Sequence, residues 1–173
     1  QVFDLEKLKW LNRKHLARLS PRELLERARP FLSSYAGVPE GKLAAALELL
    51  RPGISTLAEL ADHPDLGYLL GPVELSPHVL EELSAPQARA ALQRVLSRLG
   101  PGFSPEKLRP LVREVAGELG VPTRGVFHPL RLALTGRERG PELAGIVGVL
   151  GVEEVRARLA TALRAVEEAP GEG

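Results

Sequence analysis

Hydrophobic residues recur at helical spacing along most of the chain, and the alternating runs that are typical of strands are absent. A first helix is predicted after Asp4, a natural N-cap, because Leu8 and Leu11 continue a helical pattern behind it. A second is predicted after Ser20, because Ser followed by Pro and, at the third position, by Glu is typical of helix starts. The pattern therefore predicts an all-α fold.

The same signals predict helices in the rest of the chain, and turns rich in Gly or Pro separate them. These helices cover residues 42–50, 85–99, 104–120, 123–134, 142–150 and 152–169, with a shorter restart after residues 55–56. Residues 63–78 contain several Gly and Pro residues and form the least regular stretch. We therefore predict two small helical subdomains, at residues 1–80 and 81–173.

Composition narrows the classes of function. Of the 173 residues, 44% are hydrophobic, which is enough for a real core, and the absence of Cys excludes disulfides and Cys-based zinc sites. The chain has 23 Lys and Arg against 22 Asp and Glu, so any nucleic-acid surface must come from local clustering. No apolar run is long enough to span a bilayer, and no membrane association is expected.

The residues do not assemble into an active site. None of the four histidines belongs to an HExxH motif or a His-x-x-x-His pair, so no metal site is predicted. Phosphate-binding loops of the Walker type, GxGxxG motifs and Gly-x-Ser-x-Gly elbows are also absent. The remaining candidate chemistry lies in clustered arginines, which suit planar contacts to phosphates and bases.

One such cluster lies in residues 129–143, where Arg131 stands among aliphatic residues and a Gly-bounded loop contains Arg137 and Arg139. The loop closes with Gly-Pro-Glu-Leu, which is typical of a helix start. Guanidiniums beside the free N–H groups of a helix start suit anionic or base-edge partners. On spacing alone, the simpler interpretation is a solvated turn between two core helices.

Three segments resemble motifs of bacterial glutamyl-tRNA synthetases, which are class I aminoacyl-tRNA synthetases. They read VFDLEKLKWLN at residues 2–12, RPGISTL at 51–57, and PLRLALTG at 129–136 followed by GPEL at 140–143. The segments occur in the order that the family shows, with compatible spacing, and together they extend over almost the whole chain.

The resemblance implies an all-α anticodon-binding region, a helical cage made of two subdomains. The catalytic Rossmann domain of such an enzyme would precede Gln1, so this chain is not expected to catalyse aminoacylation and contains no catalytic residue. The full-length protein would be a cytoplasmic, monomeric glutamate–tRNA ligase that uses ATP and Mg²⁺ in protein biosynthesis. The implied partner of this chain is tRNA, and no cofactor is expected within it.

Residue roles follow from the motif positions that match. The resemblance implies that Arg131 contacts an anticodon base and that Pro141 and Leu143 pack on the second and third bases. Gly140 replaces a small hydroxyl residue that is frequent in the family, which removes one side-chain hydrogen bond. The remaining implied positions are Trp10 and Asn12, at the junction with the preceding domain, and Arg13, Lys14, Arg137 and Arg139, as candidate tRNA backbone contacts.

Gly53 is the informative departure from the family pattern. Synthetases that accept only glutamate tRNA usually have Arg at this position, where it reads the first anticodon base. A Gly offers only backbone, so the sequence predicts relaxed specificity that extends to glutamine tRNA. Arg51, two residues away, is the candidate that would compensate.

Two other interpretations stay open at the level of sequence. One is a helical protein-interaction module without nucleic-acid affinity, which the near-zero net charge favours slightly. The other is a stand-alone paralogue that keeps the fold and has lost the ligase domain.

Overall fold

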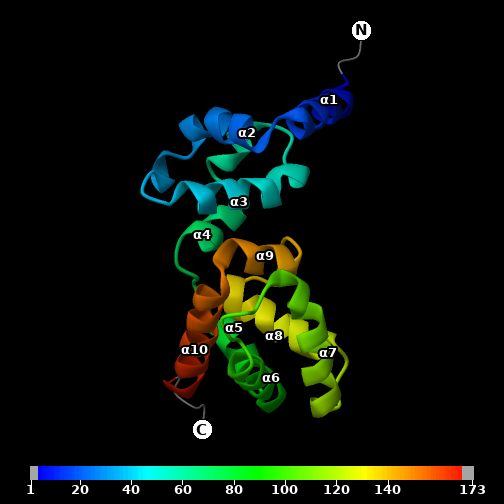
Figure 1. Cartoon of the computed structure of the whole chain (residues 1–173), viewed down its shortest axis with the longest axis vertical. Coiled ribbons are helices and arrows are strands. Elements are labelled where there is room, and N and C mark those ends of the chain that lie inside the picture. The colour runs from blue at the N-terminus through cyan, green and yellow to red at the C-terminus, as the bar shows by residue number, and fades with distance from the viewer. Residues whose placement is uncertain (1–3, 169–173) are drawn as a thin grey trace. The chain divides into compact units, whose positions relative to one another are not determined.

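The computed structural model describes residues 4–168, which form α-helices, short 3₁₀ turns and no strand (Figure 1). The predicted all-α fold is confirmed. The chain divides into two compact units, Gln1–Gly71 and Pro72–Gly173. No helix within the described residues has both the length and the apolar character needed to cross a bilayer.

The first unit contains four α-helices joined by 3₁₀ turns. The helices are α1 (Leu5–Arg18), α2 (Pro21–Ala28), α3 (Glu40–Leu50) and α4 (Pro64–Leu70), and the turns are η1 (Arg29–Phe31), η2 (Ser33–Tyr35), η3 (Arg51–Gly53) and η4 (Leu57–Leu60). Helix α3 packs against both α2 and α4, and α1 contacts η3. The core of this unit is mostly leucine, including the fully buried Leu24, Leu47, Leu60, Leu66 and Leu69.

The second unit is built around one helix, α8. Its elements are α5 (Pro77–Leu83), α6 (Pro86–Ser97), η5 (Pro105–Lys107), α7 (Leu108–Leu119), α8 (Arg124–Thr135), α9 (Leu143–Leu150) and α10 (Val152–Glu168). Helix α8 packs against α5, α6, α7 and α10 (Figure 1). Leu130, Leu132, Ala133 and Leu134 are all at most 1% exposed, so the C-terminal half of α8 is apolar on nearly every side because helices cover it.

The predicted helix starts are confirmed at both N-terminal caps. The Asp4 carboxylate accepts a hydrogen bond from the Lys7 N–H at 3.0 Å. Ser20 and Glu23 form a reciprocal capping box, in which the Ser20 hydroxyl accepts from the Glu23 N–H and the Glu23 carboxylate accepts from the Ser20 N–H. These starts could be predicted because each cap is completed within four residues.

The irregular stretch at residues 63–78 is more helical than predicted. Helix α4 begins there, with the His63 ring accepting a hydrogen bond from the Asp65 N–H and Pro64 at the first helical position. Helix α5 likewise begins with Ser76 as the cap and Pro77 behind it. Pro at a first helical position loses no helical hydrogen bond, so these prolines start helices and do not break them.

The boundary between the units also differs from the predicted one. It falls between Gly71 and Pro72, whereas a boundary after residue 80 would divide helix α5. The reason is packing, because α5 contacts α6, α8 and α10 of the second unit.

Helix α1 leaves most of its apolar positions in contact with solvent. Leu5, Leu8, Trp10 and Leu11 are 40–52% exposed, and Leu16 is the buried residue of this helix. The helical spacing was therefore predicted correctly, but the face that it defines does not enter the core of the first unit. Phe3, which belongs to the same pattern, lies outside the described residues.

Glu118 of α7 joins α7 to α6 through two guanidiniums. Its carboxylate accepts hydrogen bonds of 2.6 Å from Arg98 and from Arg94. The hydrogen bonds from Arg98, followed by those from Arg94, lower the pKa of Glu118 from 4.5 to about 2. Glu118 thus stays ionised over most of the acid range.

We expect Glu118→Gln to lower the melting temperature at neutral pH and to have less effect in acid. The folded pKa of about 2 lies below the ordinary value of 4.5, so the stabilisation is present above pH 4.5 and is lost as pH falls toward 2. Thermal melts at several pH values measure this difference. Glu114→Gln is the matched control, because Glu114 lies on the same helix at 3.6 Å from Arg98 and is more exposed. A difference between wild type and Glu118→Gln that does not change with pH would contradict the assignment.

Candidate nucleic-acid interface

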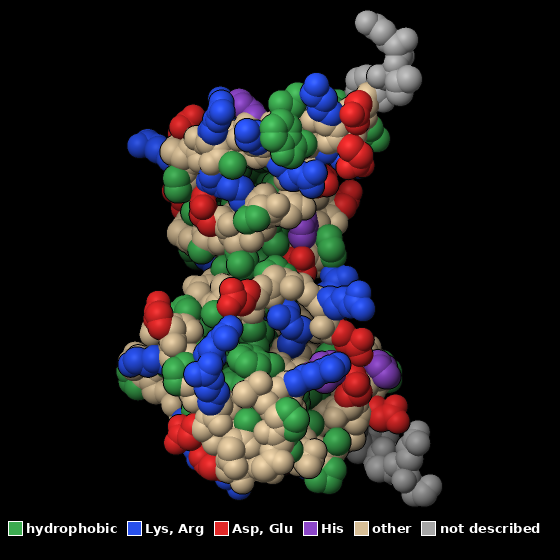
Figure 2. Space-filling model, turned by 90° about the vertical axis from the view of Figure 1, so that its right-hand side faces the viewer, with side chains coloured by type: hydrophobic (Ala, Val, Ile, Leu, Met, Phe, Trp, Pro, Cys, Tyr) green, Lys and Arg blue, Asp and Glu red, His purple; other side chains and the backbone are tan. Residues whose placement is uncertain are grey.

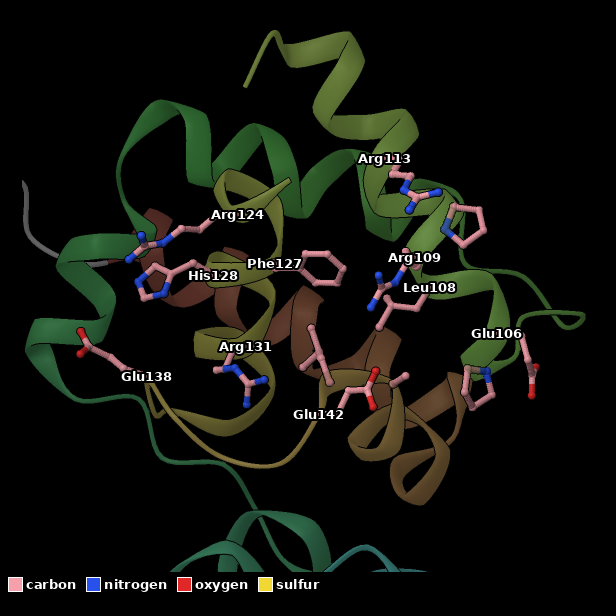
Figure 3. A pocket seen from close by; sticks show the side chains of 14 residues that line it. Glu106, Leu108, Arg109, Arg113, Arg124, Phe127, His128, Arg131, Glu138 and Glu142 are labelled. Atoms are coloured by element: carbon pink, nitrogen blue, oxygen red, sulfur yellow. The ribbon is translucent and has the colours of Figure 1, made fainter. Parts of the chain in front are cut away.

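The second unit has a hollow of about 690 Å³ between η5, α7, α8 and the start of α9 (Figure 3). Its ionisable lining residues are Glu106, Arg109, Arg113, Arg124, His128, Arg131, Glu138 and Glu142, and its apolar ones include Leu108, Phe127 and Leu143. On the face drawn in Figure 2, Lys and Arg side chains surround exposed hydrophobic surface of this unit. The hollow thus combines guanidiniums with an apolar floor.

Arg131 is fixed in this hollow by the backbone of a distant segment. Its guanidinium donates a hydrogen bond to the Pro141 carbonyl at 2.9 Å. Leu143, two residues further on, is 4% exposed and lines the hollow beside it. The structure therefore brings together Arg131, Pro141 and Leu143, three of the residues predicted for the site, whereas their contact with a base stays a prediction.

The end of α8 determines how the chain reaches Pro141. Gly136 has a left-handed φ of 71°, and Thr135, which is buried, accepts a hydrogen bond from the Arg137 N–H at 3.0 Å. The Leu134 carbonyl accepts a hydrogen bond of 2.7 Å from Arg158, a buried arginine of α10. Together these bonds satisfy the last turn of α8 and direct the connecting segment toward α9.

The connecting segment itself, residues 136–142, is mostly exposed. Arg137, Arg139 and Gly140 lie at its surface and are not among the residues that line the hollow. Glu138 of the same segment does line it. The roles predicted for Arg137, Arg139 and Gly140 stay predictions.

Arg109, Arg113 and Phe127 are among the residues of the hollow that the sequence reasoning missed. Arg109 and Arg113 lie one turn apart on α7, and Phe127 extends from α8 toward Leu108 and Arg109 (Figure 3). The helical period of α7 could have indicated the two arginines, because its buried residues, such as Leu108, lie on one face and leave Arg109 and Arg113 together on another. Phe127 carries no such signal, since an aromatic residue in a helix usually belongs to the core.

Carboxylates line the hollow as well, but three of its arginines form no ion pair with them. Within residues 4–168, Arg109, Arg113 and Arg124 form no ion pair, whereas Arg94 of α6 and Arg98, the residue that follows this helix, share Glu118. Unpaired guanidiniums beside an aromatic ring suit unstacked, single-stranded bases and their phosphates.

Arg51 of the first unit has a different environment from the one predicted. Its guanidinium donates a hydrogen bond to the Leu19 carbonyl at 2.7 Å and another to the Glu48 carboxylate, and its side chain is only 13% exposed. Arg51 thus caps the end of α1 and is not presented as a base reader. Gly53 is exposed, and a Cβ built on it would meet no atom within 4 Å.

The other predicted residues of the first unit lie on α1. Arg13 and Lys14 are exposed, and the Lys14 ammonium lies 4.5 Å from the centre of the Trp10 ring. Trp10 is half-exposed and Asn12 is partly buried. Their roles at a domain junction or on a tRNA backbone stay predictions.

Comparison with known proteins gives the class of this fold. Residues 23–163 match the family described as "Anticodon binding domain". This match extends over most of the chain, which therefore belongs to the anticodon-binding domain family.

The relatives specify the kind of anticodon-binding domain. The chain is 34% identical over 174 residues to a glutamate–tRNA ligase of Syntrophobacter fumaroxidans, and this match covers 98% of the chain and 37% of the relative. It is 38% identical over 167 residues to glutamate–tRNA ligase 1 of Rubrobacter xylanophilus, with 94% of the chain and 38% of the relative covered. The chain is thus homologous to the C-terminal region of bacterial glutamate–tRNA ligases and spans little more than a third of their length, as the resemblance implied.

Solved structures share the fold. The crystal structure of a glutamate tRNA ligase from Elizabethkingia meningosepticum superposes with a TM-score of 0.78 at 21% sequence identity, and covers 95% of this chain and 33% of that one. At this identity the likeness supports the all-helical architecture alone.

We expect Gly136→Ala to destabilise the second unit more than Gly120→Ala does. Both glycines end a helix with a left-handed φ, so each substitution costs about 1–2 kcal/mol of backbone strain. A Cβ at Gly136 would also lie 2.2 Å from the Glu74 carbonyl oxygen, whereas one at Gly120 meets nothing within 4 Å. The additional loss for Gly136→Ala should be about 1–3 kcal/mol in urea unfolding experiments. Equal losses of stability in the two variants would show that the Glu74 backbone moves away from the added Cβ at no energetic cost.

Proposed function

We propose that the hollow of the second unit binds bases of a tRNA anticodon loop, and that the chain is the anticodon-binding part of a longer glutamate–tRNA ligase. The observation that carries this proposal is the fixed Arg131, whose guanidinium is held by the Pro141 carbonyl at 2.9 Å in a hollow that the half-buried Phe127 also lines. One guanidinium N–H is used by that carbonyl, and the others are left for a base edge.

Each wall of the hollow has its own task in this proposal. Arg131 reads a base edge, while Pro141, beside the buried Leu143, forms the apolar surface on which bases pack. Arg109 and Arg113, on the α7 side, hold the phosphates between the splayed bases. Recognition of unstacked bases by stacking and by guanidiniums is the usual way in which proteins read single-stranded RNA.

The chain supplies recognition, and the chemistry belongs to other parts of the ligase. We place the binding of ATP and Mg²⁺, and the transfer of glutamate to tRNA in the cytoplasm, in the part of the relatives that this chain does not cover. The exposed apolar face of α1, with Trp10 and Asn12, is the proposed junction with that part. Its exposure in this chain is consistent with a surface that another domain covers.

The first unit is proposed to contact the opposite end of the anticodon through Gly53. Without a guanidinium at this position the first base is read weakly, which would admit glutamine tRNA as well as glutamate tRNA. Arg51 does not compensate, because its guanidinium caps α1 and bonds Glu48.

We expect Arg131→Ala to weaken the binding of an anticodon hairpin by about 1–3 kcal/mol, because a base loses its guanidinium contact. Fluorescence anisotropy with a labelled hairpin measures this loss. Arg164→Ala is the matched control, since Arg164 is an exposed arginine of α10 that does not line the hollow. An equal loss of hairpin affinity in both variants would show that Arg131 acts only through its contribution to the net charge.

The same titration at several salt concentrations separates the proposal from a protein-interaction module. A domain that holds phosphates releases counterions, so its affinity should fall steeply as salt rises. Absence of hairpin binding at low salt would support the interaction module.

We expect Gly53→Arg to shift binding toward a CUC anticodon hairpin and away from a UUG hairpin, by about 1–3 kcal/mol in relative affinity. The new side chain has room, because nothing lies within 4 Å of the added Cβ. Gly53→Ala controls for the loss of glycine without adding a guanidinium. An unchanged ratio of affinities in Gly53→Arg would exclude the specificity role of this position.

A further inference from the structure

Four titratable side chains from three elements meet beside the hollow. His78 and Glu82 lie one turn apart on α5, His128 belongs to α8, and Glu138 belongs to the segment between α8 and α9. Figure 3 shows His128 and Glu138 on the same side of the hollow. One ligand atom from each of His78, Glu82 and Glu138 lies within 4.8 Å of the other two.

The distances in this cluster fit a shared cation better than they fit direct hydrogen bonds. The Nε2 atom of His78 lies 3.6 Å from Oε2 of Glu82 and 3.8 Å from Oε1 of Glu138. Hydrogen bonds of this kind are usually shorter than about 3.2 Å. A tetrahedral ion with bonds of about 2.0–2.2 Å separates neighbouring ligand atoms by about 3.3–3.6 Å. Small side-chain movements therefore suffice to form a coordination shell.

One oxygen of Glu82 gives a further reason to expect a cation. Its Oε2 atom is buried and accepts no hydrogen bond from any of residues 4–168, although the carboxylate as a whole is partly exposed. A desolvated carboxylate oxygen without a donor is costly, and a bound cation removes that cost. This oxygen faces the imidazole of His78.

We propose that His78, Glu82 and Glu138 bind one divalent transition-metal ion, with Zn²⁺ as the best fit. One imidazole nitrogen and two carboxylates form a mixed nitrogen and oxygen donor set that suits Zn²⁺, and the two carboxylates balance its charge. His128, whose Nε2 lies 3.6 Å from the other oxygen of Glu82, is a positioning residue for that carboxylate. The fourth position of the ion stays open to solvent, since His78 and Glu138 are exposed.

Metal binding at this cluster would act on the segment between α8 and α9. Glu138 is the ligand that this segment contributes, and Glu82 lies on α5, so the ion ties the segment to that helix. The proposal does not depend on what binds in the hollow. The sequence search missed the cluster because the ligands are up to sixty residues apart and only the pair on α5 has helical spacing.

Titration of the chain, without an affinity tag, with ZnCl₂ in a calorimeter tests the proposal. We expect one Zn²⁺ per wild-type chain and at least tenfold weaker binding by His78→Gln and by Glu138→Gln. His15→Gln and Glu81→Gln are the matched controls, because each removes a group of the same type outside the cluster. Both controls should bind Zn²⁺ as the wild type does.

Thermal melts with and without ZnCl₂ provide a readout that does not depend on heat of binding. Zn²⁺ should raise the melting temperature of the wild type and of both controls, but not that of His78→Gln or Glu138→Gln. Glu138 is exposed on a connecting segment, so Glu138→Gln should fold like the wild type and isolate the loss of a ligand. Lack of saturable Zn²⁺ binding by the wild type, or equal binding by wild type and His78→Gln, would overturn the proposal and leave an ordinary cluster of ion pairs.

Discussion

The way in which α8 ends is the constraint on which the proposed recognition site depends. Gly136 takes a left-handed conformation against the Glu74 carbonyl, where no side chain fits, and Arg158 satisfies the Leu134 carbonyl from within the core. The chain can therefore leave α8 in only one direction, which carries the Pro141 carbonyl back to Arg131. A fixed helix end thus produces a fixed guanidinium, as preorganised recognition requires.

The arginines of this chain divide into those that build the fold and those that are left for a partner. Arg51 and Arg158 satisfy carbonyls at the ends of helices, and Arg94 and Arg98 share Glu118. Once these are set aside, Arg109, Arg113 and Arg124 of the hollow form no ion pair within the described residues, and the same holds for arginines elsewhere such as Arg13 and Arg89. A net charge of +1 is therefore compatible with a locally basic site, because most acidic residues neutralise arginines elsewhere or lie on other faces.

Local signals in the sequence predicted most helices. Tertiary contacts determine which side chains line the hollow, and local signals do not show this. The cap at Ser20 was predictable because its partners lie within four residues. Helix α4 was missed because the Gly and Pro residues of 63–78 were interpreted as marks of an irregular stretch, whereas Pro64 starts a helix. Arg131 was found through its motif. Phe127 was not, because only the fold shows that a helical aromatic residue faces a hollow and not the core.

The segment between α8 and α9 is where the two proposed sites meet. At its C-terminal end the Pro141 carbonyl binds Arg131, and near its start Glu138 approaches His78 of α5. Glu138 and His128 belong both to the lining of the hollow and to the metal-ligand cluster. One short segment therefore carries a contact to α8 at one end and a contact to α5 near the other. A substitution in this segment that displaces its backbone would disturb both contacts, whereas Glu138→Gln removes a ligand of the cluster and leaves the hydrogen bond between Arg131 and Pro141 in place.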